Sequence, residues 1–97
     1  MAITLDQVRR HCTDIQRVAA KYGARNVRIF GSVARGAAGP ASDVDVLVAF
    51  EHGRSLLDVI GFEQDLSELL GCKVDVVSEG GISPYLDDRI LREAVAL

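Results

Sequence analysis

Two neighbouring aspartates form the part of this chain best suited to chemistry on phosphate groups. Asp43 and Asp45 open an apolar, β-branched run that is typical of a strand. Alternate residues of a strand share a face, so the two carboxylates should project together, roughly 6–7 Å apart at Cα. Such a pair can hold two divalent cations about 3.5–4 Å apart and so stabilise an in-line displacement at phosphorus. Oxygen ligands favour Mg²⁺ or Mn²⁺ over zinc.

A glycine and a serine upstream are suited to binding a polyphosphate. Gly31 lets the backbone approach a ligand, and Ser32 can cap a short helical turn whose N–H groups would face the phosphates. Arg35 should lie one turn into that helix, where it could reach a phosphate oxygen as a fixed cation. A solvated helix residue is an equally good interpretation of Arg35.

A third acid, Asp75, lies inside a second strongly β segment from Cys72 to Val77, where a charged side chain is costly. If this strand pairs with the strand of Asp43 and Asp45, three carboxylates converge. Like charges that close raise one another's pKa and oppose folding unless cations bind among them. The convergence would therefore favour a metal site.

Each acid also has a plain structural interpretation. Asp43 could be a turn residue, and Asp45 an exposed strand residue. Asp75 could pair with Lys73 on the same face of its strand. Only the combination of Asp43 and Asp45 with the pair Gly31-Ser32 favours a functional interpretation, and these residues together favour a ligand role for Asp75.

These motifs resemble a known family. The segments 30–36, 42–48 and 73–77 are similar to the nucleotidyltransferase superfamily typified by DNA polymerase beta, and more narrowly to the minimal nucleotidyltransferases of prokaryotes. The closing segment 90–97 is similar to that group too, so the resemblance extends over nearly the whole chain from Val27 onward. It implies an α/β (α+β) fold with a small three-stranded mixed sheet, and transfer of a nucleoside monophosphate from an NTP, with pyrophosphate leaving.

The resemblance also implies roles for individual residues. Asp43 and Asp45 would bind two Mg²⁺ ions, and Asp75 would help hold the catalytic metal and deprotonate the acceptor hydroxyl. Gly31 and Ser32 would hold the β- and γ-phosphates of ATP. The sequence does not depart from the family pattern at these five positions.

The family implies a partner as well. Many minimal nucleotidyltransferases are encoded beside a HEPN-domain toxin and act as its antitoxin by adenylylating a tyrosine, so a hetero-oligomer with such a toxin is implied. The spacing of the residues names neither the acceptor nor the nucleotide. Two alternatives stay open: a nucleotidyltransferase acting on a small molecule such as an aminoglycoside, and a non-catalytic antitoxin that neutralises its partner by binding alone.

Length and composition narrow the class of protein. Ninety-seven residues predict one domain spanning 1–97, with no room for a second, acceptor-binding domain. A net charge of −3 with scattered basic residues argues against direct binding of a nucleic-acid polymer. Cys12 and Cys72 lack metal-ligand spacing and are expected in the core. No basic-then-apolar leader and no long apolar run are visible, which predicts a cytoplasmic protein without membrane contact.

Hydrophobic spacing and capping signals predict the elements that position these residues. The expected order is α-β-α-β-α-β-α, with helices packed on a small sheet. His52 and Arg54 are expected in a loop that flanks the acids. The expected elements are a helix of about 18 residues ending at Gly23, a strand 27–30, a short helix after Gly31, a strand 44–50, a helix 55–70, a strand 72–77, and a final helix from Ser83-Pro84 to Leu97.

Overall fold

The computed structural model describes residues 3–36, 43–79 and 90–97. The expected helix start at Ser83-Pro84 and most of the expected return after Gly36 lie outside these residues. A short helix also covers residues 90–93. The other elements are α1 (Leu5–Arg10), α2 (Cys12–Tyr22), β1 (Ala24–Phe30), α3 (Gly31–Ala34), β2 (Val44–Phe50), α4 (Leu56–Leu70), β3 (Val74–Ser78) and β4 (Val95–Ala96).

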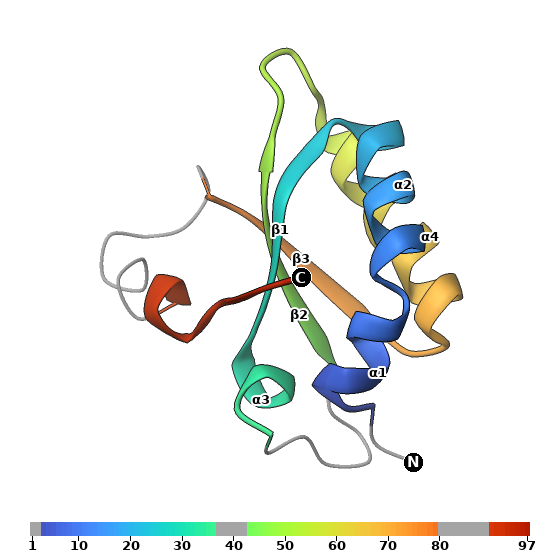
Figure 1. Ribbon diagram of the computed structural model, residues 1–97. Coiled ribbons are helices and arrows are strands. Elements are labelled where there is room, and N and C mark those ends of the chain that lie inside the picture. The colour runs from blue at the N-terminus through green and yellow to red at the C-terminus, as the bar shows by residue number, and fades with distance from the viewer. Residues whose placement is uncertain (1–2, 37–42, 80–89) are drawn as a thin grey trace.

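The four strands form one mixed sheet in the order β3-β2-β1-β4. β1 pairs antiparallel with both β2 and β4, whereas β2 and β3 run parallel and are joined through α4. Figure 1 shows α1, α2 and α4 on one face of the sheet, the helix 90–93 beyond the other face, and α3 at one end. The predicted α/β fold with a mixed sheet is therefore confirmed.

The core lies between the sheet and the helices on its covered face. Along β2, alternate side chains point into this layer and are almost completely buried, from Val44 to Val48. They meet Phe62 and Leu66 of α4 and Ile15 of α2, all of them fully buried. The face that carries Asp45 is therefore the one turned away from α2 and α4.

Capping chemistry fixes the longest helix at both ends. Ser55 and Asp58 form a capping box at the start of α4, and Gly71 ends it with φ of +69°. Both boundaries match the sequence prediction. The helix therefore delivers the chain to β3 at a defined point, next to the start of β2.

The first helix is interrupted, so the prediction of one helix of about 18 residues was wrong. His11 ends α1 and precedes α2 with φ of −94° and ψ of 11°. Its N–H donates to the carbonyl of Val8, three residues back, at 3.0 Å. A hydrogen bond of this spacing tightens the turn in the manner of a 3₁₀-helix and breaks the α-helical ladder.

The end of the chain is a strand, so the prediction of a helix running to Leu97 was wrong and the sheet has four strands instead of three. The helix stops at Glu93, after which Val95 pairs with Ile29 and Ala96 with Arg28. The open edge of β1 supplies backbone hydrogen-bond partners that a final helical turn would not use. A β-branched valine suits this extended position.

Two further expectations concern composition. Cys12 and Cys72 were expected in the core, but both are free thiols of intermediate exposure. Cys72 packs against the core. Within residues 3–36, 43–79 and 90–97, no helix is long and apolar enough to cross a membrane.

The role of α4 in the core leads to a stability prediction. Phe62 is 0% exposed and touches Tyr22 and Phe50, so Phe62→Ala should lower the free energy of unfolding by about 3–5 kcal/mol. Leu57→Ala on the same helix is the matched control, because Leu57 is 77% exposed and its truncation should cost less than about 0.5 kcal/mol. Urea unfolding measures both values. Equal losses in the two variants would contradict this description of the core.

Candidate functional site

Strand register brings the predicted site residues to one end of the sheet. Asp45 on β2 is the register partner of Phe30 on β1, the residue just before Gly31. On its other side, Asp45 is the register partner of Asp75 on β3. Neighbouring strands lie about 4.8 Å apart, so Asp45 stands directly between the Gly31 turn and the third acid. After Gly31 the chain turns back and β2 runs antiparallel to β1, which brings Asp45 next to Gly31.

Gly31 is required by its backbone and by its neighbour. Its φ is +74°, a conformation that side-chain-bearing residues rarely adopt. A Cβ atom built there would overlap Oδ2 of Asp45 and lie 3.2 Å from its Cγ. The carboxylate of Asp45 therefore packs directly against the Gly31 backbone. Ser32 follows in α3, the short helix expected at this position.

Lys73 and Asp43 form an ion pair at the rim of the acid group. Lys73 Nζ lies 3.7 Å from Asp43 Oδ2, and both side chains are partly exposed. The sequence suggests Asp75 as a partner of Lys73, whereas the structure pairs Lys73 with Asp43. Lys73 lies two residues before Asp75, just ahead of β3, and in extended backbone residues at this spacing share a face. This spacing was the available signal for a cation near the acids.

The acids perturb one another's protonation. Partial burial raises the pKa of Asp45, and the negative charges of Asp75 and Asp43 raise it further, while Arg35 lowers it. Partial burial also raises the pKa of Asp75, as do a hydrogen bond with Asp43 and the charges of Asp43 and Glu63, while Lys73 lowers it. The site therefore holds more negative charge than its surroundings neutralise.

The donor chemistry fits a hard divalent cation, although the side chains are not gathered around one point. Carboxylate oxygens are the ligands that Mg²⁺ and Mn²⁺ prefer, and the raised pKa values of Asp45 and Asp75 show uncompensated charge that a cation would neutralise. Among the residues that the structure describes, no three His, Cys, Asp or Glu side chains are close enough to form a metal site as they stand. A cation would have to draw the acids together.

Arg35 lies near the acids but binds a different residue. It ends α3, and its Nη1 donates to Oε2 of Glu93 at 3.0 Å. This ion pair joins the predicted phosphate-binding turn to the helix that precedes β4. The sequence contained no signal for Glu93, because the contact depends on how the chain end folds back.

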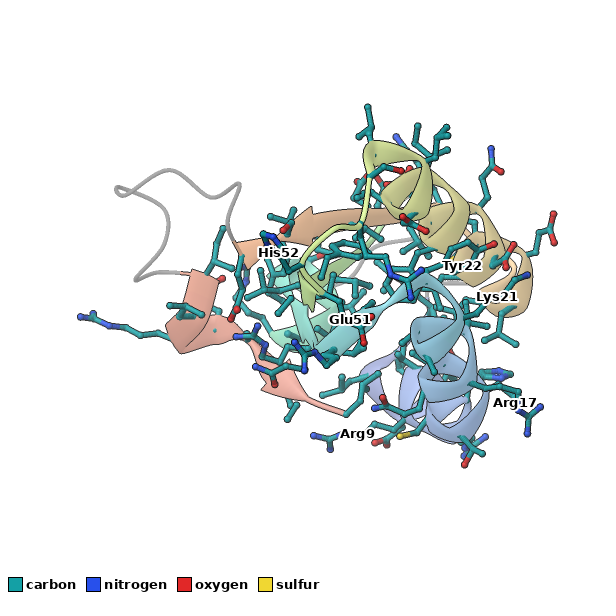
Figure 2. All side chains as sticks on the ribbon, turned by 90° about the horizontal axis from the view of Figure 1, so that it is seen from above. Arg9, Arg17, Lys21, Tyr22, Glu51 and His52 are labelled. Carbon is teal, nitrogen blue, oxygen red and sulfur yellow. The ribbon has the colours of Figure 1, made fainter. Side chains whose placement is uncertain are left out.

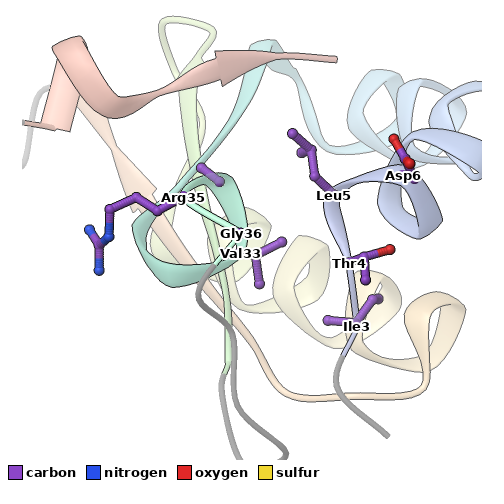
Figure 3. A pocket seen from close by; sticks show the side chains of 8 residues that line it. Ile3, Thr4, Leu5, Asp6, Val33, Arg35 and Gly36 are labelled. Carbon is purple, nitrogen blue, oxygen red and sulfur yellow. The ribbon is translucent and has the colours of Figure 1, made fainter.

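A cavity of about 370 Å³ lies beside α3, between it and the start of α1. Thr4, Leu5 and Val33 are among the residues that line it, whereas the three acids are not. Figure 3 shows the guanidinium of Arg35 extending away from Leu5 and Thr4. The cavity is therefore separate from the group of acids.

His52 and Arg54 do not flank the acids, and that expectation was wrong. Asp43 precedes β2 and His52 follows it, so the length of the strand, roughly 20 Å, separates them. Figure 2 looks down on the end of the molecule where Glu51 and His52 lie close together. Arg54 pairs with Glu51 and Asp58.

Comparison with known proteins identifies relatives of this chain. Residues 12–97 match the family described as nucleotidyltransferase domain. A curated protein of Thermococcus cleftensis named protein adenylyltransferase MntA is 37% identical over 94 residues, 96% of this chain and 95% of that protein.

Solved structures agree with the fold. One described as that of a candidate minimal nucleotidyltransferase superposes with a TM-score of 0.88 at 47% identity, covering 98% of this chain and 97% of the other. A crystal structure of a toxin–antitoxin with AMP-PNP superposes with a TM-score of 0.74 at 20% identity, covering 87% of this chain and 69% of that one. The second likeness bears on the fold alone.

Close packing at Gly31 leads to a paired prediction. Gly36→Ala should lower the free energy of unfolding by about 1–2 kcal/mol, because Gly36 has φ of +72° but open space around it. Gly31→Ala should lower it further, since the same backbone strain is joined by overlap with Asp45. Urea unfolding of both variants measures the difference. Equal destabilisation would show that Asp45 does not press on Gly31.

Charge repulsion at Asp45 leads to a pH prediction. Its pKa is raised above the unfolded value of 3.8, so the folded state binds the proton more tightly and ionisation costs folding free energy as pH rises through the raised pKa. Asp45→Asn should therefore be more stable than the native chain at pH 7 without divalent cations, and the gain should vanish below about pH 3. Thermal unfolding against pH measures this, with Asp14→Asn, which changes a half-exposed aspartate of α2, as control. A constant difference at all pH values would contradict it.

Proposed function

This chain belongs to the nucleotidyltransferase domain family, and from that membership we propose that it transfers AMP from ATP to a hydroxyl group of a partner toxin and so acts as an antitoxin. The enzyme class, a nucleotidyltransferase, follows from the family and from relatives named protein adenylyltransferase. The observation that carries the proposal to particular residues is the register that sets Asp45 between Gly31 and Asp75. The activity would reside in one domain spanning residues 1–97.

The acids would act on the two ends of the displacement. Asp43 and Asp45 would hold two Mg²⁺ ions, with Mn²⁺ as a substitute, and Asp75 would help hold one of them. When bound, the ions would supply charge stabilisation for the attacking and leaving oxygens at the α-phosphorus. The acceptor oxygen forms the new P–O bond, the bond to the β-phosphate breaks, and pyrophosphate leaves. Asp75 would accept the hydroxyl proton.

The turn at the start of α3 would hold the leaving group. Gly31 keeps the backbone free of a side chain beside Asp45, and the first turn of a helix leaves N–H groups without partners in the helix. Gly31 and Ser32 would bind the β- and γ-phosphates there. Arg35 would contribute a positive charge once it exchanges Glu93 for a phosphate oxygen.

The proposed class of acceptor rests on the relatives and on the net charge. A relative of 37% identity named protein adenylyltransferase supports a protein acceptor. We place the acceptor on a HEPN-domain toxin, most simply on a tyrosine hydroxyl, with the two proteins forming a hetero-oligomer in the cytoplasm. The net charge of −3 does not favour a nucleic-acid acceptor.

Label transfer tests the proposal directly. The chain is incubated with α-labelled ATP, Mg²⁺ and the protein encoded next to it, and label should appear on that neighbour. The Asp43→Ala/Asp45→Ala variant should lose about a thousandfold in rate, because removal of both metal ligands forfeits several kcal/mol of charge stabilisation. Asp14→Ala, which changes a half-exposed aspartate of α2, is the matched control and should transfer normally.

Different outcomes separate the alternatives. Neutralisation of the toxin by the double variant, without label transfer, would replace catalysis with inhibition by binding. Label found only on an added aminoglycoside or another small molecule would sink the protein-acceptor proposal. Unchanged transfer by the double variant would remove Asp43 and Asp45 from the site.

A further inference from the structure

We propose that Glu63 and Ser67 of α4 are positioning residues that hold Asp75 in register beside Asp45. This inference rests on the proposed function, in which Asp75 helps bind the metal. It concerns residues outside the acid group, on the helix that connects the two acid-bearing strands.

The strand that carries Asp75 is the edge of the sheet. Among the residues that the structure describes, β3 pairs with β2 alone. The carbonyl of Lys73 faces β2, where it accepts a hydrogen bond from Val44 N at 3.0 Å. Alternate backbone groups of a strand point to opposite sides, so the amides of Val74 and Val76 point away from β2. These amides need partners from outside the sheet.

Both outward amides are bound by α4. Val74 N donates to Ser67 Oγ at 3.2 Å, and Val76 N donates to Glu63 Oε2 at 3.2 Å. The Ser67 hydroxyl in turn donates to the carbonyl of Glu63 at 2.8 Å. The two amides are those of the residues immediately before and after Asp75. The backbone of the third acid is therefore fixed at two points, one on either side of it.

A glutamate at this position carries an electrostatic cost. The Glu63 carboxylate, bound to the amide next to Asp75, adds a negative charge beside a strand that already carries an acid. A serine or glutamine could accept the same hydrogen bond without that cost. The charge makes sense if the site normally holds cations, because Glu63 then adds attraction for them while its oxygen holds the strand.

Direct cation binding to the purified chain tests the inference. Mn²⁺ binding is followed by electron paramagnetic resonance, and amide exchange at Val74 and Val76 by nuclear magnetic resonance. Glu63→Met should weaken Mn²⁺ binding by about tenfold or more and speed exchange at Val76, since neither the acceptor nor the charge remains. Ser67→Ala should speed exchange at Val74. Glu63→Gln should keep slow exchange at Val76 and recover part of the Mn²⁺ affinity.

Controls separate positioning from general destabilisation and from a wrong site. Glu68→Met, an exposed glutamate on the same helix, should change neither measurement. Native Mn²⁺ affinity and slow exchange in Glu63→Met would overturn the inference. If Asp75→Asn binds Mn²⁺ as well as the native chain, the proposed role of Asp75 fails. Unchanged Mn²⁺ binding in Asp75→Asn would also remove the link between Glu63 and metal binding. In that case faster amide exchange at Val76 in Glu63→Met would still support the anchoring of β3 by α4.

Discussion

The register of β2 between its two neighbours is the constraint on which the rest of the structure depends. Antiparallel pairing with β1 sets the end of that strand, and hence Gly31, against Asp45. Parallel pairing with β3 sets Asp75 on the other side. A slip of one residue in either pairing would turn one partner to the opposite face, into the layer occupied by Phe62 and Leu66. Core packing and site geometry are therefore selected by the same register.

The price of this arrangement is electrostatic. Three carboxylates near one end of a sheet repel one another. Two cations face them: Lys73 pairs with Asp43 at the rim of the group, and Arg35 pairs with Glu93 outside it. The fold tolerates the repulsion because the core beneath β2 is continuous and almost completely buried. An unliganded site of this kind gains stability from any cation that enters it, which couples ligand binding to folding.

Local signals predicted the central elements well. The run of β-branched residues after Asp43 marked β2 at both ends, and Ser55 with the glycine at position 71 marked the two ends of α4. The elements that failed depend on distant contacts. The last residues read as a helical stripe, but the unpaired edge of β1 draws Val95 into a strand. Likewise, the sequence analysis could only assume that the strand of Asp75 pairs with the strand of Asp45, because no local pattern states which strands become neighbours.

Hydrogen bonding along the two sheet edges also bears on self-association. An open edge is a template on which another strand can add, and soluble proteins shield it. On one side, α4 occupies the outward amides of β3. On the other, β4 is only two residues long and offers little backbone for a further strand. In the described part of the chain both edges are partly shielded in this way, which disfavours growth of the sheet by strand addition, the route to fibrils.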